Sequence, residues 1–468
     1  KPAEALPVEL SATQPHPIDL RWVDELMADV RPRLRVRPED ELLILVPNTP
    51  IKVNGTALRV LAAMVDEGLG IREVLAREGD TPGRRRHLHA FFTDLSAWLS
   101  GTLGEGDGRR AVVREPFRAD FCRYPLLSEV ALTYRCNLSC AFCYAGCGAA
   151  GLPDGWNEER TMSDGEVCLV LDRIAGEARC PSVSFTGGEP TVRPGLARFV
   201  AHAKGLGLAV NLISNGQLLD ARRVAELAEA GLDSAQLSLE GPSAEVHDGL
   251  VGRPGAFDRL WRAVDHLKDA GVRVHTNTTV NRRNLDHLEA LVDEVAARGM
   301  ERMTMNLVIP CGSASHPTAT GPDLTVPYTE AGDAVLRVRA RAAERGVELI
   351  WYSPLPLCLF NTVAHGLGNR GCAAADGLLH VNPAGDVLPC SSFRHGESLG
   401  SLLRQPFEEI WRSRAARFLR GKRMMPPGCA GCPDAEVCQG ACVLYWREMG
   451  CAELGRAPDE RPALPVFA

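Results

Sequence analysis

The pattern of apolar and polar positions divides the chain into regions of different secondary structure. Within residues 21–115, three short extended runs are separated by turns that contain Pro and Asn, and three segments with apolar residues at helical spacing follow. The extended runs are at 34–36, 42–46 and 51–53, and the helical segments are at 57–65, 71–76 and 87–99. Three strands followed by three helices predict a winged-helix-like domain at 21–115, and the Pro-rich residues 1–20 are expected to form a tail.

Residues 116–345 instead alternate between apolar, β-branched runs and amphipathic helical segments. The six runs are at 130–133, 183–186, 210–214, 235–239, 272–278 and 304–309. Repeated strand–helix units predict an α/β fold with a parallel sheet, in the form of a partial (β/α)6 barrel of the TIM type. The active site of such a barrel lies at the carboxyl ends of its strands. The remaining residues, 346–468, are rich in Cys, Gly and Pro and predict a domain organised by metal.

Charge and composition narrow the functional classes. The 468 residues carry 59 acidic and 52 basic side chains, for a net charge of −7, which argues against a nucleic-acid-binding protein. No apolar run approaches the length of a membrane span, and the polar first residues lack the apolar core of a signal peptide. We therefore expect a cytoplasmic protein with neither nucleic acid nor membrane as a partner.

Sixteen cysteines are the unusual feature of the composition. A reducing cytoplasm does not sustain a disulfide scaffold, so clustered cysteines there more often bind metal or do redox work. Cys136, Cys140 and Cys143 follow the first predicted barrel strand, where the active site belongs. Three thiolates in one loop can hold three irons of a [4Fe–4S] cluster and leave the fourth iron open. A zinc loop or buried thiols would be the alternative, although zinc usually takes four ligands.

This C-x3-C-x2-C loop, with Phe142 before its last cysteine, resembles the loop of the radical S-adenosylmethionine (SAM) enzymes. The resemblance implies that the open iron binds the amino and carboxylate groups of SAM. Reductive cleavage of SAM then gives methionine and a 5′-deoxyadenosyl radical that abstracts a hydrogen atom from the substrate. By the same resemblance, Phe142 and Tyr144 lie along the adenine.

A second motif follows the second predicted strand, with the sequence Gly187, Gly188, Glu189 and Pro190. Paired glycines allow the backbone to approach a ligand closely, and a following carboxylate can accept an ammonium group. The motif resembles the GGEP sequence of the same family, which contacts the amino group of SAM.

Three further strand-end residues are implied to approach the ribose or methionine part of SAM: Ser214, Asn215 and Ser238. Ordinary turn chemistry at strand ends explains them equally well. Glu240 stands where many relatives carry Asp, and Asn277 and Asn306 are expected at the same mouth of the barrel.

The C-terminal cysteines have a long and specific spacing. Cys372 is followed by twelve residues, Gly385, four residues and Cys390, and a later C-x2-C-x5-C-x3-C run begins at Cys429. The spacing resembles the SPASM extension of radical SAM enzymes, whose eight thiolates hold two auxiliary [4Fe–4S] clusters. The resemblance assigns Cys358, Cys372, Cys390 and Cys442 to auxiliary cluster I, and Cys429, Cys432, Cys438 and Cys451 to auxiliary cluster II.

Cys358 lies outside the core spacing; without it, cluster I would keep an open iron for a substrate thiolate or carboxylate. Two zinc knuckles are the alternative for the whole set. Cys147 and Cys311 are expected near the barrel mouth, where either is a candidate hydrogen-atom donor, as in peptide epimerases, or an inert thiol. Sulfatase-maturating relatives carry an Asp directly after the cysteine that matches Cys390. Here that position is Ser391, which argues against formylglycine formation.

Residues 30–100 resemble the peptide-recognition domain (RRE) of ribosomal-peptide maturases, which is related to the PqqD-like peptide chaperone of pyrroloquinoline quinone synthesis. A leader peptide would pair with a sheet edge beside a helix, and Arg84, Arg85 and Arg86 would attract an acidic leader. The alternatives are a DNA-binding winged helix and, for the arginines, a solvated face.

Together these patterns predict a radical SAM/SPASM oxidoreductase that forms an oxidative cross-link (thioether, C–C or C–O) in a precursor peptide. It would need three [4Fe–4S] clusters, SAM and an electron donor such as ferredoxin or flavodoxin. Modification of a protein or small molecule without a leader, redox-neutral epimerisation, and a non-catalytic metal-organised DNA-binding regulator are the alternatives.

Overall fold

The computed structural model describes residues 18–100, 122–147, 160–315 and 324–455, together with residues 462, 465 and 467. Of the predicted tail at 1–20, residues 1–17 lie outside these residues. The chain divides into two compact units, Lys1–Glu115 and Pro116–Ala468. Each unit is described by itself below.

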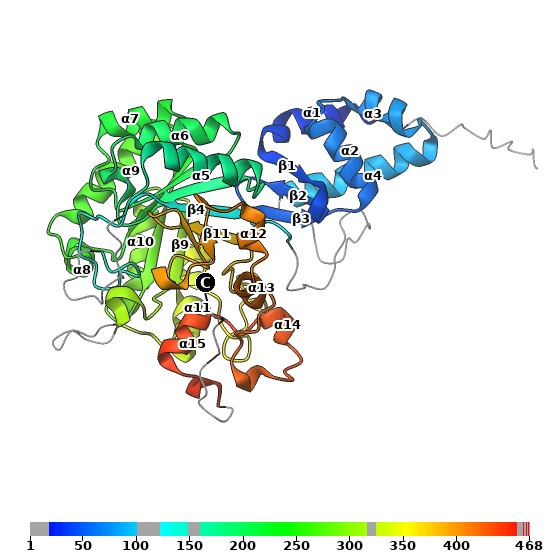
Figure 1. Cartoon of the computed structure of the whole chain (residues 1–468). Coiled ribbons are helices and arrows are strands. Elements are labelled where there is room, and N and C mark those ends of the chain that lie inside the picture. The colour runs from blue at the N-terminus through cyan, green and yellow to red at the C-terminus, as the bar shows by residue number, and fades with distance from the viewer. Residues whose placement is uncertain are drawn as a thin grey trace, which may run out of the picture. The chain divides into compact units, whose positions relative to one another are not determined.

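Within residues 18–100, the N-terminal unit contains a three-stranded antiparallel sheet and four α-helices (Figure 1). The strands pair in the order β1-β2-β3 and are β1 (Leu34–Arg37), β2 (Leu42–Leu45) and β3 (Thr49–Lys52). The helices are α1 (Arg21–Val30), α2 (Gly55–Val65), α3 (Ile71–Glu78) and α4 (Pro82–Leu99). The three predicted strands and three predicted helices are thus present, in the predicted order.

Helix α1 is the helix of the N-terminal unit that the sequence analysis missed. Its buried residues Val23, Met27 and Val30 recur every three to four positions, which is the spacing of an amphipathic helix. They pack into the unit's own hydrophobic core with Leu61 and Phe92. Because α1 precedes the strands, the unit has one element more than the predicted winged-helix-like arrangement, which stays a prediction.

The C-terminal unit contains the predicted alternation of strands and helices. The first six strands are β4 (Leu127–Ala131), β5 (Ser182–Thr186), β6 (Ala209–Ser214), β7 (Ser234–Ser238), β8 (Arg273–Val280) and β9 (Arg302–Leu307). The helices that follow strands are α5 (Asp164–Gly176), α6 (Leu196–Gly205), α7 (Ala221–Glu229), α8 (Ala244–Val251), α9 (Ala256–Asp269), α10 (Leu288–Ala297) and α11 (Tyr328–Arg345). All six predicted strands are present within a few residues of the expected bounds.

The sheet is larger than the predicted six strands. Its order is β10-β9-β8-β7-β6-β5-β4-β11-β12-β13, with parallel pairing from β10 through β11 and antiparallel pairing of β12 and β13. The added strands are β10 (Glu348–Trp351), β11 (Leu378–Val381), β12 (Asp386–Leu388) and β13 (Gly400–Ser401). Every residue of β5 is buried, as expected for a central parallel strand covered on both faces.

The Cys-rich region therefore joins the parallel sheet through β11, which pairs with β4. Up to residue 455, its α-helices are short: α12 (Phe407–Trp411), α13 (Arg414–Arg420), α14 (Ala435–Cys438) and α15 (Val443–Met449). No helix in the described ranges has the length and apolar character needed to cross a membrane.

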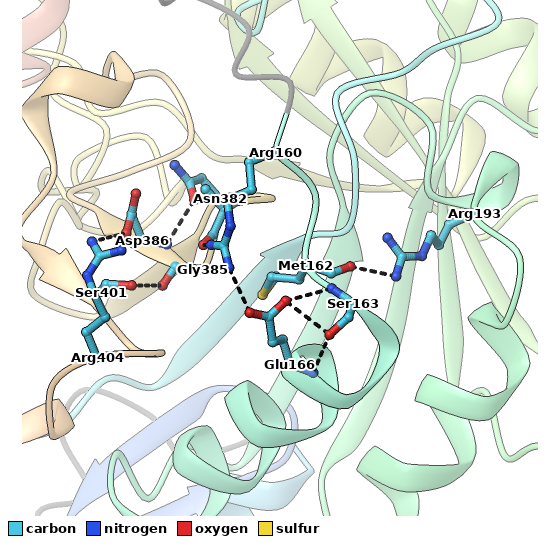
Figure 2. A network of polar contacts seen from close by, with 11 residues as sticks. Arg160, Met162, Ser163, Glu166, Arg193, Asn382, Gly385, Asp386, Ser401 and Arg404 are labelled. Atoms are coloured by element: carbon cyan, nitrogen blue, oxygen red, sulfur yellow. Dashed lines mark hydrogen bonds and ion pairs between the residues drawn. The ribbon is translucent and has the colours of Figure 1, made fainter.

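Figure 2 shows a polar network that ties the β11–β12 turn to the segment before α5. The Arg160 guanidinium donates to the carbonyl oxygen of Ala384 at 2.6 Å and to Glu166 at 2.7 Å. Gly385 in this turn has a φ of +86°, which a residue with a side chain rarely adopts. The glycine in the predicted Cys372–Cys390 spacing thus serves a tight turn that joins the two predicted domains.

Candidate active site

The loop that carries Cys136, Cys140 and Cys143 begins just beyond the end of β4. Backbone N–H groups are directed at its sulfur atoms: Leu138 donates to Cys136 Sγ at 3.4 Å and Cys147 to Cys143 Sγ at 3.3 Å. Burial raises the pKa of Cys136 to about 11. Metal coordination deprotonates a thiol outright, so the donors and the burial together fit thiolates held by iron.

Helix α8 anchors this loop from outside. The N–H groups of Ser139 and Ala141 donate to the carbonyl oxygens of Val251 and Leu250, each at 3.1 Å. The cysteines Cys136 and Cys140 also pack against a small apolar cluster that includes Val251. The sequence analysis missed α8, and with it the support of the loop.

The two glycines of the GGEP motif lie directly against the segment that precedes Cys136. Gly188 N–H donates to the carbonyl oxygen of Thr133 at 2.7 Å. A Cβ on Gly187 would lie 2.2 Å from that oxygen, and one on Gly188 would lie 2.5 Å from the carbonyl oxygen of Arg135. The sequence analysis explained the glycines by close approach to a ligand, whereas the structure shows close approach of two backbone segments.

The Glu189 carboxylate joins the ends of β5 and β6. Its Oε1 accepts bonds from the N–H and hydroxyl of Thr191 (3.0 and 2.5 Å) and from the hydroxyl of Ser214 (2.8 Å). Its Oε2 accepts the N–H of Asn215 at 2.8 Å. Burial raises the pKa of Glu189, although these donors favour its charged form. The motif carboxylate therefore positions two of the other predicted SAM contacts.

Asn215 reaches the cysteine loop in turn. Its side-chain amide donates to Asn137 Oδ1 at 2.8 Å and lies 3.8 Å from Cys136 Sγ. Three of the predicted SAM-binding segments, at β4, β5 and β6, are thus connected by hydrogen bonds at one edge of the sheet. Asn137 was not among the predicted residues, and its contacts depend on segments about eighty positions apart in sequence.

The remaining predicted SAM contacts are less tightly connected. Phe142 and Tyr144 are half-buried in the cysteine loop, and Ser238 is half-buried at the end of β7. Glu240 is buried, and its Oε2 accepts the N–H of Thr279 at 2.9 Å. Burial raises the pKa of Glu240 to about 8.

Asn277 and Asn306 face each other across β8 and β9. The Asn277 amide donates to Asn306 Oδ1 at 2.9 Å, and the Thr304 hydroxyl donates to Asn277 Oδ1 at 2.9 Å. The two predicted strand-end amides therefore lie side by side on β8 and β9, toward the carboxyl ends of these strands.

The two candidate hydrogen donors have different surroundings. The Cys147 thiol donates to the sulfur of Cys143, which lowers the pKa of Cys143 and raises that of Cys147. Cys311 follows β9, and burial raises its pKa to about 12 despite a hydrogen bond with Ser392. Cys147 is thus a partner of a predicted cluster ligand, while Cys311 lies between the cysteine loop and the segment after Cys390.

The turn after Cys311 clamps the cysteine loop. Ser313 N–H donates to the carbonyl oxygen of Cys143 at 2.8 Å. Gly312 has a φ of +60°, and a Cβ there would lie 2.1 Å from the same oxygen and 2.4 Å from that of Tyr144. The sequence analysis did not single out Gly312, because nothing in its own neighbourhood shows that another loop packs against it.

We expect Gly312→Ala to displace the cysteine loop and to lower bound iron by about four atoms per chain, the content of one [4Fe–4S] cluster. The physical reason is that two backbone carbonyl groups occupy the space of the new methyl group. Gly299→Ala is the matched control, because Gly299 has a φ of +64° but its Cβ would meet only Lys268 Nζ at 3.8 Å. Equal iron contents in the two reconstituted variants would contradict the clamp.

The C-terminal thiols form two groups. Burial raises the pKa of Cys390, and the charges of the Cys372 and Cys442 thiols add to the rise. Cys429, Cys432 and Cys438 instead line a separate cavity of about 110 Å³, and Cys358 lines it with them. The sequence analysis placed Cys358 in the first group.

The remaining second-group residue, Cys451, is 3% exposed and packs in the main core. Within the described ranges, no three His, Cys, Asp or Glu side chains converge on the position of a single metal ion.

Comparison with protein families finds two matches in the C-terminal unit. The radical SAM superfamily matches residues 130–295, and the SPASM iron-sulfur cluster-binding domain matches residues 372–433. The chain therefore contains a radical SAM domain followed by a SPASM domain. The first match spans β4 to α10, and the second includes the predicted ligands from Cys372 to Cys432.

The curated relatives of this chain carry different names. An AdoMet-dependent heme synthase of Oleidesulfovibrio alaskensis is 29% identical over 334 residues, which are 66% of this chain and 80% of that protein. A PqqA peptide cyclase of Streptomyces rochei is 29% identical over 320 residues, which are 67% of this chain and 83% of that protein.

Among solved structures, SuiB of Streptococcus suis has the same fold over nearly the whole chain. Its TM-score is 0.61 at 16% identity, and the match covers 93% of this chain and 99% of SuiB. Further SuiB structures, at TM-scores of 0.59 and 0.61 and identities of 18% and 15%, are bound to S-adenosylmethionine and to the precursor peptide SuiA; each match covers 88% of this chain and 94% of SuiB.

Proposed function

We propose that this protein is a radical SAM maturase that forms an oxidative cross-link in a ribosomally made precursor peptide. The observation that carries the proposal is the contact of the GGEP segment with the three-cysteine loop, through Gly188 and Thr133. This contact brings the predicted cluster ligands and the predicted SAM contacts together at the carboxyl ends of β4, β5 and β6.

The residues of the chain would act as ligands and positioning groups. When bound, the cluster and SAM supply a 5′-deoxyadenosyl radical that takes a carbon-bound hydrogen atom from the peptide. Cys136, Cys140 and Cys143 would hold the irons, while Glu189 keeps Ser214 and Asn215 in place through its hydrogen bonds. A new bond formed after hydrogen abstraction leaves one electron to remove, and the two C-terminal thiol groups would hold the acceptors. An external ferredoxin or flavodoxin would supply the electron that starts the reaction.

Three findings support a peptide as the substrate. Two curated relatives are named as PqqA peptide cyclases, and SuiB, which has the same fold, has been solved with its precursor peptide bound. The N-terminal unit supplies a small antiparallel sheet with adjoining helices, which suits strand addition by a leader. Of the arginines proposed to attract that leader, Arg85 already pairs with Asp80 at 2.6 Å.

A small molecule is the second candidate substrate, because the relative from Oleidesulfovibrio alaskensis is named as a heme synthase. That relative matches 66% of this chain, whereas the similarity to SuiB covers 93%. The larger match extends into the N-terminal unit, whose proposed role in leader binding favours a peptide substrate.

The test is to reconstitute the protein without oxygen and to offer it SAM, a reductant and each short peptide encoded beside its gene. We expect 5′-deoxyadenosine together with the loss of two hydrogen atoms per cross-link, located by fragment-ion mass spectrometry. Cys140→Ala is the control that should form neither product. Deuterium incorporation from heavy water without that mass loss would mean epimerisation. An unchanged mass in both waters, with 5′-deoxyadenosine still formed, would contradict the peptide substrate.

A further inference from the structure

The cavity near α14 is lined by four cysteine side chains. They come from two segments far apart in the sequence, one before β11 and one in the C-terminal C-x2-C-x5-C run. The four are Cys358, Cys429, Cys432 and Cys438. The other lining residues are mostly apolar and include Met425, Trp446 and Leu454.

A hydrogen bond ties the Cys358 segment to this cavity. The N–H of Leu357, the residue before Cys358, donates to Cys438 Sγ at 3.3 Å. Backbone N–H groups directed at sulfur stabilise thiolate ligands of iron–sulfur clusters and tune their potentials. The segment thus contributes both a donor to one predicted ligand and a further thiol that lines the same space.

The chemistry of the cavity suits a cluster with four thiolate ligands. Isolated thiolates are costly in apolar surroundings, and soft thiolate ligands select zinc or iron–sulfur centres. Cys451, the other cysteine assigned to this cluster from the sequence, is not among the described residues that line the cavity. Cys372, Cys390 and Cys442 do not line it either.

We propose that Cys358 is a ligand of auxiliary cluster II, together with Cys429, Cys432 and Cys438. The proposal rests on the proposed function, because it requires iron–sulfur clusters in the SPASM region. It exchanges the ligand assignment that the family resemblance implies: Cys358 moves from cluster I to cluster II, and Cys451 is not needed to complete cluster II. Cluster I then retains Cys372, Cys390 and Cys442.

The test compares iron content in single and double variants of the full chain. When two ligands of the same cluster are both removed, the iron lost should be less than the sum of the losses in the two single variants. When the two ligands belong to different clusters, the losses should add. The wild-type chain should hold about twelve irons, and Cys372→Ala and Cys358→Ala about eight each, by four irons per cluster. The Cys358→Ala, Cys372→Ala double variant should fall to about four, while Cys358→Ala, Cys438→Ala should stay near eight.

Electron paramagnetic resonance of the reduced proteins supplies an independent readout. Cys358→Ala and Cys438→Ala should lose the same signal, and Cys372→Ala a different one. Cys358 is exposed, so its replacement leaves the packed core intact. Cys168→Ala on α5 is the matched control and should keep all iron, and Cys451→Ala should keep cluster II.

The possible failures are distinguishable. A wild-type chain that binds no iron would overturn the proposed function as well. If the wild type holds three clusters but the Cys358→Ala, Cys372→Ala pair loses no more iron than Cys372→Ala alone, Cys358 belongs to cluster I and only this inference is wrong. Full iron retention by Cys358→Ala together with unchanged electron paramagnetic resonance signals would also overturn it, because loss of a ligand changes the signal even of a cluster that three thiolates still hold.

Discussion

Glu189→Gln is expected to weaken SAM binding by roughly 5- to 150-fold, because at least one buried backbone donor then faces an amide NH2 group. The wild-type carboxylate accepts four hydrogen bonds, three on Oε1 and one on Oε2. If the NH2 takes the place of Oε2, it opposes the N–H of Asn215. If it takes the place of Oε1, it opposes the N–H of Thr191, although the two hydroxyl groups can rotate to accept.

The substitution is also expected to affect the cysteine loop, through Asn215. Once Asn215 is displaced, its amide no longer holds Asn137 Oδ1 beside Cys136. A Glu189→Gln chain should therefore show a lower affinity for SAM in anaerobic titrations, with 5′-deoxyadenosine formation reduced at non-saturating SAM.

Glu166→Gln is the matched control for this substitution. Glu166 also accepts backbone and hydroxyl donors, from Ser163, but it is only half-buried and lies in a capping box, where glutamine serves as well as glutamate. Equal SAM affinities for the two variants would contradict the positioning role of Glu189.

The elements of the fold that the sequence predicted are those whose signal is local. A central strand such as β5 is a continuous buried run, and α9 has a clear apolar stripe. Helix α8 was missed because it is short and contains Gly249, and strands β10 to β13 because they have only two to four residues. Such short strands are determined by pairing with neighbours rather than by their own composition.

The residues of the candidate site also fall into those that a local pattern predicts and those that it does not. The cysteine loop, the GGEP motif and the SPASM spacing are visible in the sequence because each is a contiguous pattern. The position of Gly312 against Cys143, and that of Cys358 beside Cys438, depend on segments 169 and 80 residues apart. No local rule predicts which distant segments meet, so these contacts required the structure.

Removal of the N-terminal unit, Lys1–Glu115, is expected to lower kcat/KM for a full-length precursor by roughly 10²- to 10⁴-fold. Under the proposed function this unit binds the leader, and the tether then raises the effective concentration of the core peptide at the barrel. The unit has its own hydrophobic core, which includes Val23 and Phe92, so its removal does not open the core that surrounds β5.

A core peptide without its leader provides the matched control. It has nothing for the N-terminal unit to bind, so the full and the shortened chains should convert it at the same slow rate. Formation of 5′-deoxyadenosine in the absence of peptide should also be equal in the two chains. If the shortened chain loses activity on both peptides alike, the unit supports the catalytic domain instead of the leader; if it loses activity on neither, the leader binds elsewhere.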